Sequence, residues 1–224
     1  MGLLVTGAAS MVAVEFISLL AGRRPAEVVA TVGRSAEATY TADLSHPESV
    51  DTLTAHLPRF DRLLLCHGLL QDTPLAQQSG AQMTQSMTVN LLSTVRLIEH
   101  ALQANPHMRI AVLGSESGFK GSYDDTYALA KAALHAYVGW RRTGPDQQLV
   151  CIAPSMIADT GMTTRRRDQD RVTLRGIQHP KGRLLQSAEV AGLLYHTLYE
   201  DQGYLTNAVI PLHGGKFSSN PTHS

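Results

Sequence analysis

The sequence predicts an α/β protein built on one doubly wound, parallel β-sheet. Short apolar runs such as Leu3-Leu4-Val5 and Leu63-Leu64-Leu65 recur between longer segments that read as helices. Runs of this kind are typical of parallel strands buried on both faces, and their alternation with helices is typical of a doubly wound sheet. Because the alternation never pauses at a linker, we expect a single domain over residues 1–215 and a polar tail over 216–224.

The expected elements follow one another from the N-terminus with one irregularity. The expected strands are 3–6, 28–33, 39–42, 62–66, 109–114, 148–153 and 206–211. The expected helices are 11–22, 47–57, 83–104, 124–141 and 187–200, with an irregular segment at 160–186. Only eight residues separate Arg34 from Asp43, whereas a parallel crossover usually needs a dozen or more. The helix between the second and third strands is therefore expected to be shortened or absent.

Composition narrows the class of protein. The chain has 224 residues, 43% hydrophobic and 17% charged, as expected for a globular protein with a sizeable core. Its formal net charge is zero, which argues against nucleic acid or an acidic membrane as the main partner. No apolar run is long enough to span a bilayer, and the chain moves directly into a strand, so we expect a cytoplasmic protein. Cys66 and Cys151 are expected to be buried free thiols.

Tyr127 and Lys131 lie four residues apart within the helix expected at 124–141. Residues at this spacing share one helix face. A free tyrosine has a pKa near ~10, and a neighbouring cation favours the phenolate and lowers that pKa. The pair predicts a tyrosine that exchanges a proton with a reacting oxygen. The same spacing also arises by chance, with a half-buried phenol beside a solvated ammonium.

Two further polar residues favour the catalytic interpretation. Ser115 precedes Tyr127 by twelve residues and ends the apolar run that begins at Ile110, which reads as a buried parallel strand. Ligands of open α/β sheets bind at the carboxyl ends of the strands, so Ser115 is expected where chemistry would occur. Asn90 follows a helical pattern and precedes a set of apolar residues.

In this order, Asn90, Ser115, Tyr127 and Lys131 resemble the catalytic set of the short-chain dehydrogenase/reductase (SDR) family. The resemblance covers nearly the whole chain and implies a Rossmann-like fold. The other segments that carry it are Thr6–Ser10 as the glycine-rich turn, Asp43-Leu44 near the adenine, Cys66-His67-Gly68 in place of Asn-Ala-Gly, Pro154–Met162 near the nicotinamide, and the closing motifs Gly182–Ala191 and Leu212–Gly215.

The glycine-rich turn departs from the family pattern Thr-Gly-x-x-x-Gly-x-Gly. Gly7 remains, but Met11 and Ala13 stand at the other two glycine positions. Glycines there let a pyrophosphate approach the backbone and the helix N-terminus. The long Met11 side chain therefore predicts a loop that opens outward, a displaced cofactor or weakened binding.

The resemblance implies a nicotinamide cofactor, and Arg34 bears on which one. An acidic residue at the end of the second strand would bind the ribose diol of NAD, whereas a basic one would pair with the 2′-phosphate of NADP. Arg34 occupies that position, so NADP(H) is favoured and NAD(H) is the alternative; a solvated loop arginine is the other interpretation. The expected cofactor-binding residues are Gly7, Ser10, Met11, Arg34, Asp43, Leu44, His67, Gly68, Tyr127, Lys131, Ile157 and Thr160.

The resemblance also implies a role for each catalytic candidate. Ser115 would bind the substrate oxygen, and Tyr127 would give or take the proton. Lys131 would hold the nicotinamide ribose and lower the Tyr127 pKa, and Asn90 would hold a water that connects Lys131 to solvent. For His67, a structural role with one hydrogen bond competes with contact to a ribose or phosphate. No metal is expected, because the ten histidines show no ligand spacing.

Segment 160–186 resembles the family's substrate lid and is rich in basic residues. These are Arg165, Arg166, Arg167, Arg171, Arg175, Lys181 and Arg183, against Asp168 and Asp170. One interpretation is an anionic group on a small-molecule carbonyl or alcohol substrate; the other is a solvated, mobile loop. The resemblance also implies a homodimer or homotetramer, with the helices at 83–104 and 124–141 at one interface.

The predicted function is that of an NAD(P)(H)-dependent oxidoreductase that interconverts a carbonyl and a secondary alcohol. The alternative is a cofactor-binding sensor or partner protein without turnover, which Met11 and the altered Asn-Ala-Gly motif favour and the intact Ser115, Tyr127 and Lys131 oppose. A nucleic-acid-binding module that uses the arginines around Arg165 is disfavoured by the zero net charge.

Overall fold

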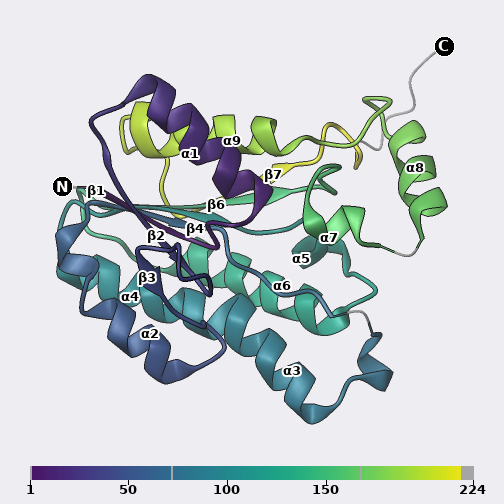
Figure 1. The fold of residues 1–224 in the computed structure, drawn as a ribbon. Coiled ribbons are helices and arrows are strands. Elements are labelled where there is room, and N and C mark those ends of the chain that lie inside the picture. Colours follow the sequence, from purple (N-terminus) through teal and green to yellow (C-terminus); the bar gives the residue numbers. More distant parts are fainter. Residues whose placement is uncertain (1, 72, 167, 218–224) are drawn as a thin grey trace.

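The computed structural model describes residues 2–71, 73–166 and 168–217. Within these ranges the chain forms one sheet of seven strands in the order β3-β2-β1-β4-β5-β6-β7 (Figure 1). All neighbouring strands are parallel, which confirms the predicted doubly wound sheet. The strands are β1 (Gly2–Thr6), β2 (Val28–Gly33), β3 (Tyr40–Thr41), β4 (Arg62–Leu65), β5 (Arg109–Leu113), β6 (Gln148–Pro154) and β7 (Ala208–Leu212).

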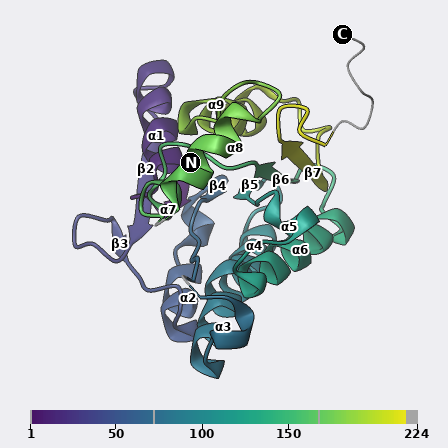
Figure 2. The ribbon, with the colours of Figure 1, turned by 90° about the vertical axis from the view of Figure 1, so that its right-hand side faces the viewer.

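Helices cover both faces of the sheet (Figures 1 and 2). One face carries α1 (Met11–Arg23) and α9 (Ser187–Tyr195), and the other carries α2 (Pro47–Thr54), α4 (Ser93–Ala104) and α6 (Asp125–Trp140). Successive strand residues point to opposite faces, so each strand contributes to two cores. In β1, Leu3 and Val5 pack toward α1 and α9, whereas Leu4 packs toward the other layer.

No helix joins β2 to β3, as predicted. Residues 34–39 alone make the connection, and β3 and this loop stand at the side of the molecule beside α1 (Figure 2). Thr31 and Thr39 tie the loop to β2, because each backbone N–H donates to the other's hydroxyl at 3.1 Å. The third strand has two residues rather than the four expected over 39–42, because the short loop leaves it little length to pair.

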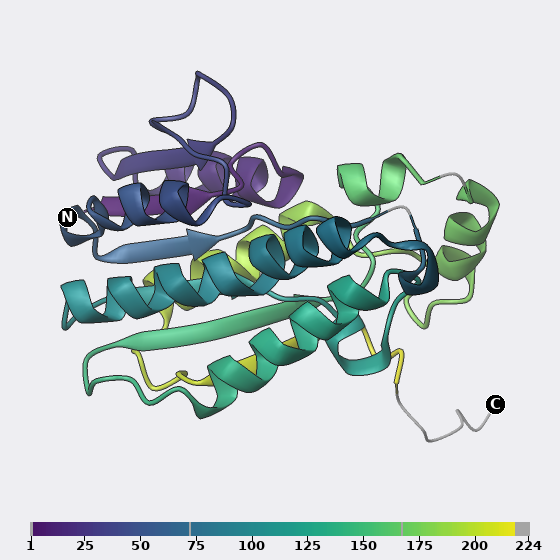
Figure 3. The same cartoon turned by 90° about the horizontal axis from the view of Figure 1, so that it is seen from below.

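Two helices contain π turns that the periodicity does not reveal. The helix expected at 83–104 runs continuously through α3 (Gly80–Met87), a π turn at Thr88–Leu92 and α4 (Figure 3). It begins earlier than expected because Ser79 and Gln82 form a capping box. The helix expected at 187–200 is α9 followed by a π turn at His196–Glu200. π turns insert single residues and are common at functional sites.

Several short elements differ from the prediction. The helix expected at 47–57 ends at Thr54 and is followed by a 3₁₀ turn at Leu57–Arg59, and another 3₁₀ turn lies at Leu75–Gln77. The segment 160–186 is partly helical, with α7 (Gly161–Thr164) and α8 (Gln169–Ile177), and α5 (Ser117–Lys120) follows β5. Such one- or two-turn helices are too short to show a clear apolar period.

Two parts of the sequence prediction cannot be compared with the structure. Arg167 of the lid and residues 218–224 of the expected polar tail lie outside the described residues. None of the helices within those ranges combines the length and the apolar character needed to cross a bilayer.

Candidate active site

A cavity of about 1300 Å³ opens at the carboxyl ends of the strands. This exceeds the ~300–1,000 Å³ of typical small-ligand pockets, so it has room for an elongated ligand. All twelve residues expected to bind the cofactor line it, and so does Ser115. Asn90 is the one catalytic candidate that does not line this cavity.

The turn after β1 places the N-terminus of α1 at the cavity wall. Gly7 has φ = 65°, and a Cβ there would lie 2.6 Å from the backbone nitrogen of His67, so only glycine fits. Ser10 caps α1, because its Oγ accepts from Ala13 N at 3.3 Å. The backbone N–H groups of Met11 and Val12 have no acceptor within the described part of the chain. Free first-turn amides of this kind bind anions.

Met11 is the first residue of α1 and lies half-buried at the cavity wall. The helix therefore starts at the position where the family pattern has its second glycine. Ala13 is fully buried in the core beneath α1. Of the two departures from the glycine pattern, only Met11 borders the space in which a ligand would lie.

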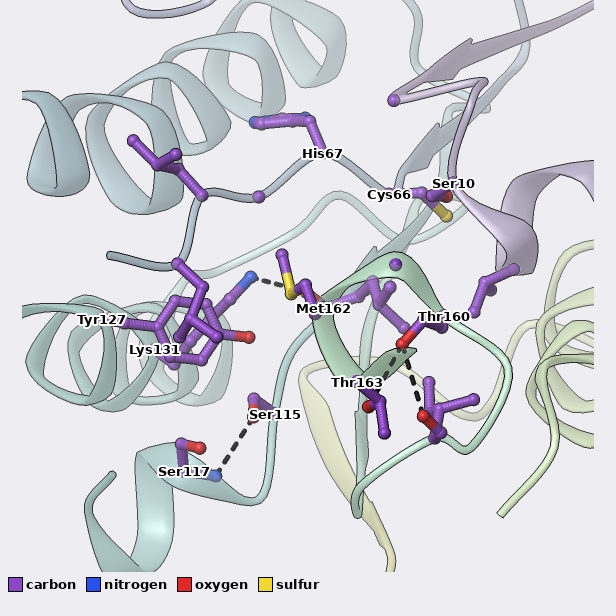
Figure 4. A pocket seen from close by; sticks show the side chains of 18 of the residues that line it. Ser10, Cys66, His67, Ser115, Ser117, Tyr127, Lys131, Thr160, Met162 and Thr163 are labelled. Carbon is purple, nitrogen blue, oxygen red and sulfur yellow. Dashed lines mark hydrogen bonds between the residues drawn. The ribbon is translucent and has the colours of Figure 1, made fainter. Parts of the chain in front are cut away.

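His67 bridges β1 to α4. Its Nδ1 lies 2.6 Å from Thr6 Oγ1, and its Nε2 lies 3.0 Å from Thr94 Oγ1 and 3.3 Å from Ser93 Oγ. Burial, with a smaller contribution from Lys131, lowers the pKa of His67 to about 3, so the ring is neutral at physiological pH. In Figure 4 the ring points away from Tyr127 and Lys131. His67 thus makes structural hydrogen bonds to more partners than the one expected, and contact with a ribose or phosphate stays a prediction.

Ser115 sits in the turn after β5 and faces the cavity (Figure 4). Its Oγ accepts from Ser117 N at 3.1 Å, which fixes the position of the oxygen. The turn itself is held to β6, because Gly114 N donates to Ile152 O at 2.7 Å and Glu116 N donates to Pro154 O at 2.8 Å.

Tyr127 and Lys131 lie one turn apart on the buried face of α6. Asp124 caps this helix and accepts from Tyr127 N at 3.1 Å. Lys131 Nζ donates to Leu113 O at 2.8 Å and lies 5.6 Å from the centre of the Tyr127 ring. Burial lowers the pKa of Lys131 to about 8, because the charged ammonium loses its hydration inside the protein.

The expected lowering of the Tyr127 pKa by Lys131 is wrong for this structure. Burial raises the pKa of Tyr127 to about 12, and a hydrogen bond from Ser115 offsets only part of that effect. The reason is geometric: the ammonium is bonded to Leu113 O rather than to the phenol. A phenol with this pKa keeps its proton at neutral pH, which is the state that a proton donor needs.

Asn90 lies fully buried in the first π turn. Its Nδ2 donates to Leu69 O at 2.7 Å and to Ser86 Oγ at 3.2 Å, and its Oδ1 accepts from Leu69 N at 2.9 Å. Both ends of the amide are thus engaged with protein groups. The side chain holds the Gly68–Leu69 backbone at the cavity wall. That Asn90 also holds a water stays a prediction.

The far end of the cavity is more exposed. Arg34 is exposed at the rim, whereas Leu44 is buried in the wall. Asp43 accepts from Ser45 N at 2.9 Å and from Ser45 Oγ at 2.7 Å. These bonds, with smaller contributions from His46 and Arg34, hold the pKa of Asp43 below its usual value. The carboxylate is therefore ionised at neutral pH.

The lid closes the other side of the cavity. Thr160 stands at the N-cap position of α7, and its hydroxyl donates to Ile157 O at 3.3 Å. The basic residues that line the cavity mouth are Lys120, Arg165, Arg166, Arg171 and Arg175. Arg166 makes a bidentate pair with Asp168, with both distances 2.8 Å, and lies over the Tyr123 ring. Lys181 and Arg183 border a separate, smaller cavity instead.

Sequence reasoning missed several polar residues beside the site. Glu116 is buried and accepts from Lys120 and Lys216 at 2.7 Å and 3.0 Å. Asp124 is also buried, and accepts from Gln71 N and Gln78 Nε2 as well as from Tyr127 N. The four-residue spacing of Glu116 and Lys120 could have predicted their ion pair. The position of Asp124 at the start of a helix could have predicted its capping role.

Cys66 and Cys151 are buried free thiols, as predicted. In the described ranges, no group of three or more His, Cys, Asp or Glu side chains is arranged to hold a metal ion.

Comparison with known proteins places this geometry in a family. A family model described as enoyl-(acyl carrier protein) reductase matches residues 7–216. The 3-oxoacyl-(acyl-carrier-protein) reductase FabG of Pseudomonas aeruginosa is 29% identical over 242 aligned positions, covering 96% of this chain and 97% of that protein. The acetoacetyl-CoA reductase of Allochromatium vinosum is 26% identical, covering 95% of this chain and 93% of that protein.

Solved structures share the fold. A short-chain dehydrogenase/reductase from Brucella melitensis has a TM-score of 0.84 at 22% identity, covering 96% of each chain. A 3-oxoacyl (acyl-carrier-protein) reductase from Agrobacterium tumefaciens with NADP bound has a TM-score of 0.82 at 22% identity, covering 95% of this chain and 93% of that one. With the family match over residues 7–216, these findings establish that the chain belongs to the short-chain dehydrogenase/reductase family of NAD(P)-dependent oxidoreductases.

Proposed function

We propose that this protein reduces a carbonyl group to a secondary alcohol with NADPH, through Ser115, Tyr127 and Lys131. The observation that carries the proposal is the meeting of these side chains at the wall of one large cavity. A protonated phenol beside a serine hydroxyl is the arrangement that a carbonyl reduction requires, because the developing alkoxide must receive a proton.

The cofactor proposed is NADP(H), with NAD(H) as the weaker ligand. Three features support the fit: the free amides of Met11 and Val12 for the pyrophosphate, the close approach allowed by Gly7, and the exposed Arg34 for a 2′-phosphate. The Agrobacterium structure named above has NADP bound. When bound, the nicotinamide supplies the hydride; the residues of this chain supply binding, orientation and the proton.

Each residue then has one task. Ser115 Oγ, fixed by Ser117 N, donates a hydrogen bond to the carbonyl oxygen of the substrate. Tyr127 gives its phenolic proton to that oxygen as negative charge develops on it. Lys131, whose ammonium is bonded to Leu113 O and lies 5.6 Å from the centre of the Tyr127 ring, would hold the ribose hydroxyls of the cofactor. Asn90 positions the Gly68–Leu69 wall rather than touching the substrate.

The substrate class proposed is a short 3-oxoacyl thioester whose carrier bears phosphate. The relatives from Pseudomonas and Allochromatium are named for such substrates. Arg171 and Arg175 support the anionic carrier, since they lie one turn apart on α8 at the cavity mouth. Like charges at this spacing destabilise a helix, and neither arginine forms an ion pair within the described part of the chain. A bound phosphate would remove the repulsion.

The test is an assay of NADPH oxidation with acetoacetyl-CoA, after the affinity for NADPH and NADH has been measured by nicotinamide fluorescence. We expect NADPH to bind more tightly than NADH and to be oxidised in the presence of acetoacetyl-CoA. Tighter binding of NADH than of NADPH would mean that Arg34 is misassigned, but it would leave the proposed carbonyl reduction standing. Failure to turn over acetoacetyl-CoA or a panel of simple ketones, despite NADPH binding, would overturn the proposal.

A second candidate is a cofactor-binding sensor without turnover, which Met11 at the first turn of α1 favours. The two candidates separate cleanly in the same assay. A sensor would bind NADPH and oxidise none of it with any carbonyl substrate, and its Tyr127→Phe variant would behave like the wild type.

Self-association into a homodimer or homotetramer is also proposed. The exposed Leu92, Leu129 and Trp140 lie on the π turn before α4 and on α6, and so support an interface on these helices. Size-exclusion chromatography with light scattering should give a dimer or tetramer for the wild type. A Leu129→Glu variant should shift to a smaller species, and a wild type that elutes as a monomer at assay concentration would contradict the proposal.

A further inference from the structure

His135 continues the buried face of α6 beyond the two catalytic candidates. Tyr127, Lys131 and His135 are spaced by four residues each, and all three are buried. The imidazole does not line the cavity. It packs against the turn after β5 instead, and none of the steps described above uses it.

Two glycines make room for this ring. A Cβ on Gly114 would lie 2.7 Å from His135 Nε2, and one on Gly118 would lie 2.6 Å from His135 Cε1. These two glycines flank Ser115 in the sequence, so the imidazole is packed under the turn that carries the serine. Phe119 covers the ring from the other side, with the ring centres 4.6 Å apart.

Within the described residues, the ring makes one hydrogen bond, to the backbone of Ser115. Ser115 N donates to His135 Nε2 at 3.5 Å, a long bond, so the ring is located mainly by the glycine contacts. Because Nε2 accepts, the proton of the neutral ring is on Nδ1, and Nδ1 is buried without a partner in the described residues. Burial and the nearby Lys131 lower the pKa of His135 to about 4, so the ring stays neutral and Nε2 stays an acceptor.

An aliphatic side chain could fill the same space without burying an unpaired nitrogen. What imidazole alone adds is an acceptor aimed at the Ser115 N–H. We propose that His135 is a positioning residue that fixes the Ser115 turn, so that the Ser115 hydroxyl meets the substrate oxygen at the Tyr127 phenol. The role of the hydroxyl rests on the proposed function; the placement of the turn by His135 does not.

The experiment compares four variants of the full-length protein. His135→Leu removes the acceptor and keeps the bulk. His135→Gln can carry an acceptor to the position of Nε2, whereas His135→Asn is polar but too short to reach it. His100→Leu is the matched control, because His100 is exposed on α4 and lies outside the cavity. Each variant is measured for kcat and KM with NADPH and acetoacetyl-CoA, and for amide hydrogen exchange in the peptide spanning residues 113–119.

We expect His135→Leu and His135→Asn to lower kcat about tenfold, the usual effect of losing one aligning hydrogen bond. The KM for NADPH should change less than twofold, and exchange in the 113–119 peptide should become faster. His135→Gln should restore kcat and exchange to within about threefold of the wild type, and His100→Leu should change neither. The contrast between Gln and Asn remains decisive should the leucine variant fail to fold.

Either of two results would overturn the proposal. Wild-type kcat and exchange in His135→Leu would show that the acceptor is not used. A glutamine variant as impaired as the asparagine variant would show that the ring shape, not the acceptor, is what matters. If the wild type reduces no carbonyl, the proposed function fails, yet the exchange of the 113–119 peptide still decides whether His135 holds the turn.

Discussion

The two ends of the cavity are built differently. At the catalytic end, Tyr127 and Lys131 are buried on a long helix, and the Ser115 turn is bonded to β6. At the nucleotide end, Arg34 is exposed at the rim and no helix joins β2 to β3. The proposed catalytic groups are therefore held in place before a ligand arrives, whereas the proposed nucleotide site presents a few exposed contacts. Substitutions at the two ends should separate effects on kcat from effects on affinity.

The largest effect is expected from Tyr127→Phe. Removal of the proton donor should lower kcat by about 10²–10⁴-fold, because the alkoxide then has no positioned acid. The Kd for NADPH should change less than twofold, because the phenylalanine retains the packing. Steady-state kinetics and fluorescence titration measure the two quantities. Survival of catalysis in this variant would show that the proton comes from another group.

At the nucleotide end, Arg34→Ala should act on affinity alone. Loss of a charge-assisted bond to a phosphate, worth about 1.5–3 kcal/mol, should raise the Kd for NADPH about 10–100-fold and leave the Kd for NADH unchanged. Arg59→Ala is the control, because Arg59 is exposed and does not line the cavity. Equal weakening of both cofactors would remove Arg34 from the 2′-phosphate site.

The buried ammonium of Lys131 should make stability depend on pH. The folded pKa of about 8 lies below the ordinary lysine value of 10.5, so between these values the unfolded chain binds more protons. Stability therefore rises as pH increases above about 8. From pH 8 to 9.5 the free energy of unfolding should gain about 2 kcal/mol from this group, at ~1.4 kcal/mol for each pH unit.

Lys131→Met isolates that contribution. The variant should lack this rise and be more stable than the wild type at pH 7, although it loses the bond to Leu113 O and the catalytic charge. Urea unfolding at pH 7 and pH 9.5 measures both effects. A wild-type stability that is flat or falls over this range, with Lys131→Met showing the same profile, would mean that the ammonium is solvated.

At the mouth of the cavity, the double substitution Arg171→Ala and Arg175→Ala should raise the KM for acetoacetyl-CoA about tenfold, the effect of losing roughly 1.4 kcal/mol of charge pairing. The KM for a neutral 3-oxoester should stay the same. Lys181→Ala is the control on the same lid, since Lys181 borders the smaller cavity. A rise in KM for both substrates would indicate a change in lid shape rather than loss of an anion site.

The sequence was a better guide to the catalytic end than to its surroundings. The strand order, the missing helix before β3 and the neighbourhood of Ser115, Tyr127 and Lys131 follow from periodicity, crossover length and family motifs. The partners of Lys131 and Asn90 do not follow, because they are the backbone of Leu113 and of Leu69, 18 and 21 residues away in the chain. The direction of the Tyr127 pKa shift was also missed, since burial depends on the packing of the whole cavity wall.

Met11 gives the smallest effect, and it tests whether the nucleotide end is altered or closed. The side chain is half-buried at the wall and α1 starts normally behind it, so Met11→Gly should tighten NADPH binding by less than about tenfold, or 1.4 kcal/mol, with kcat unchanged. Ala13→Gly changes the other position at which the family pattern has a glycine. This variant should only destabilise α1, by about 1 kcal/mol, because Ala13 faces the core. If Met11→Gly instead creates NADPH binding that the wild type lacks, the nucleotide end is closed in the native protein. The preorganised catalytic end would then lack its cofactor, and the interpretation as a protein without turnover would replace the enzyme.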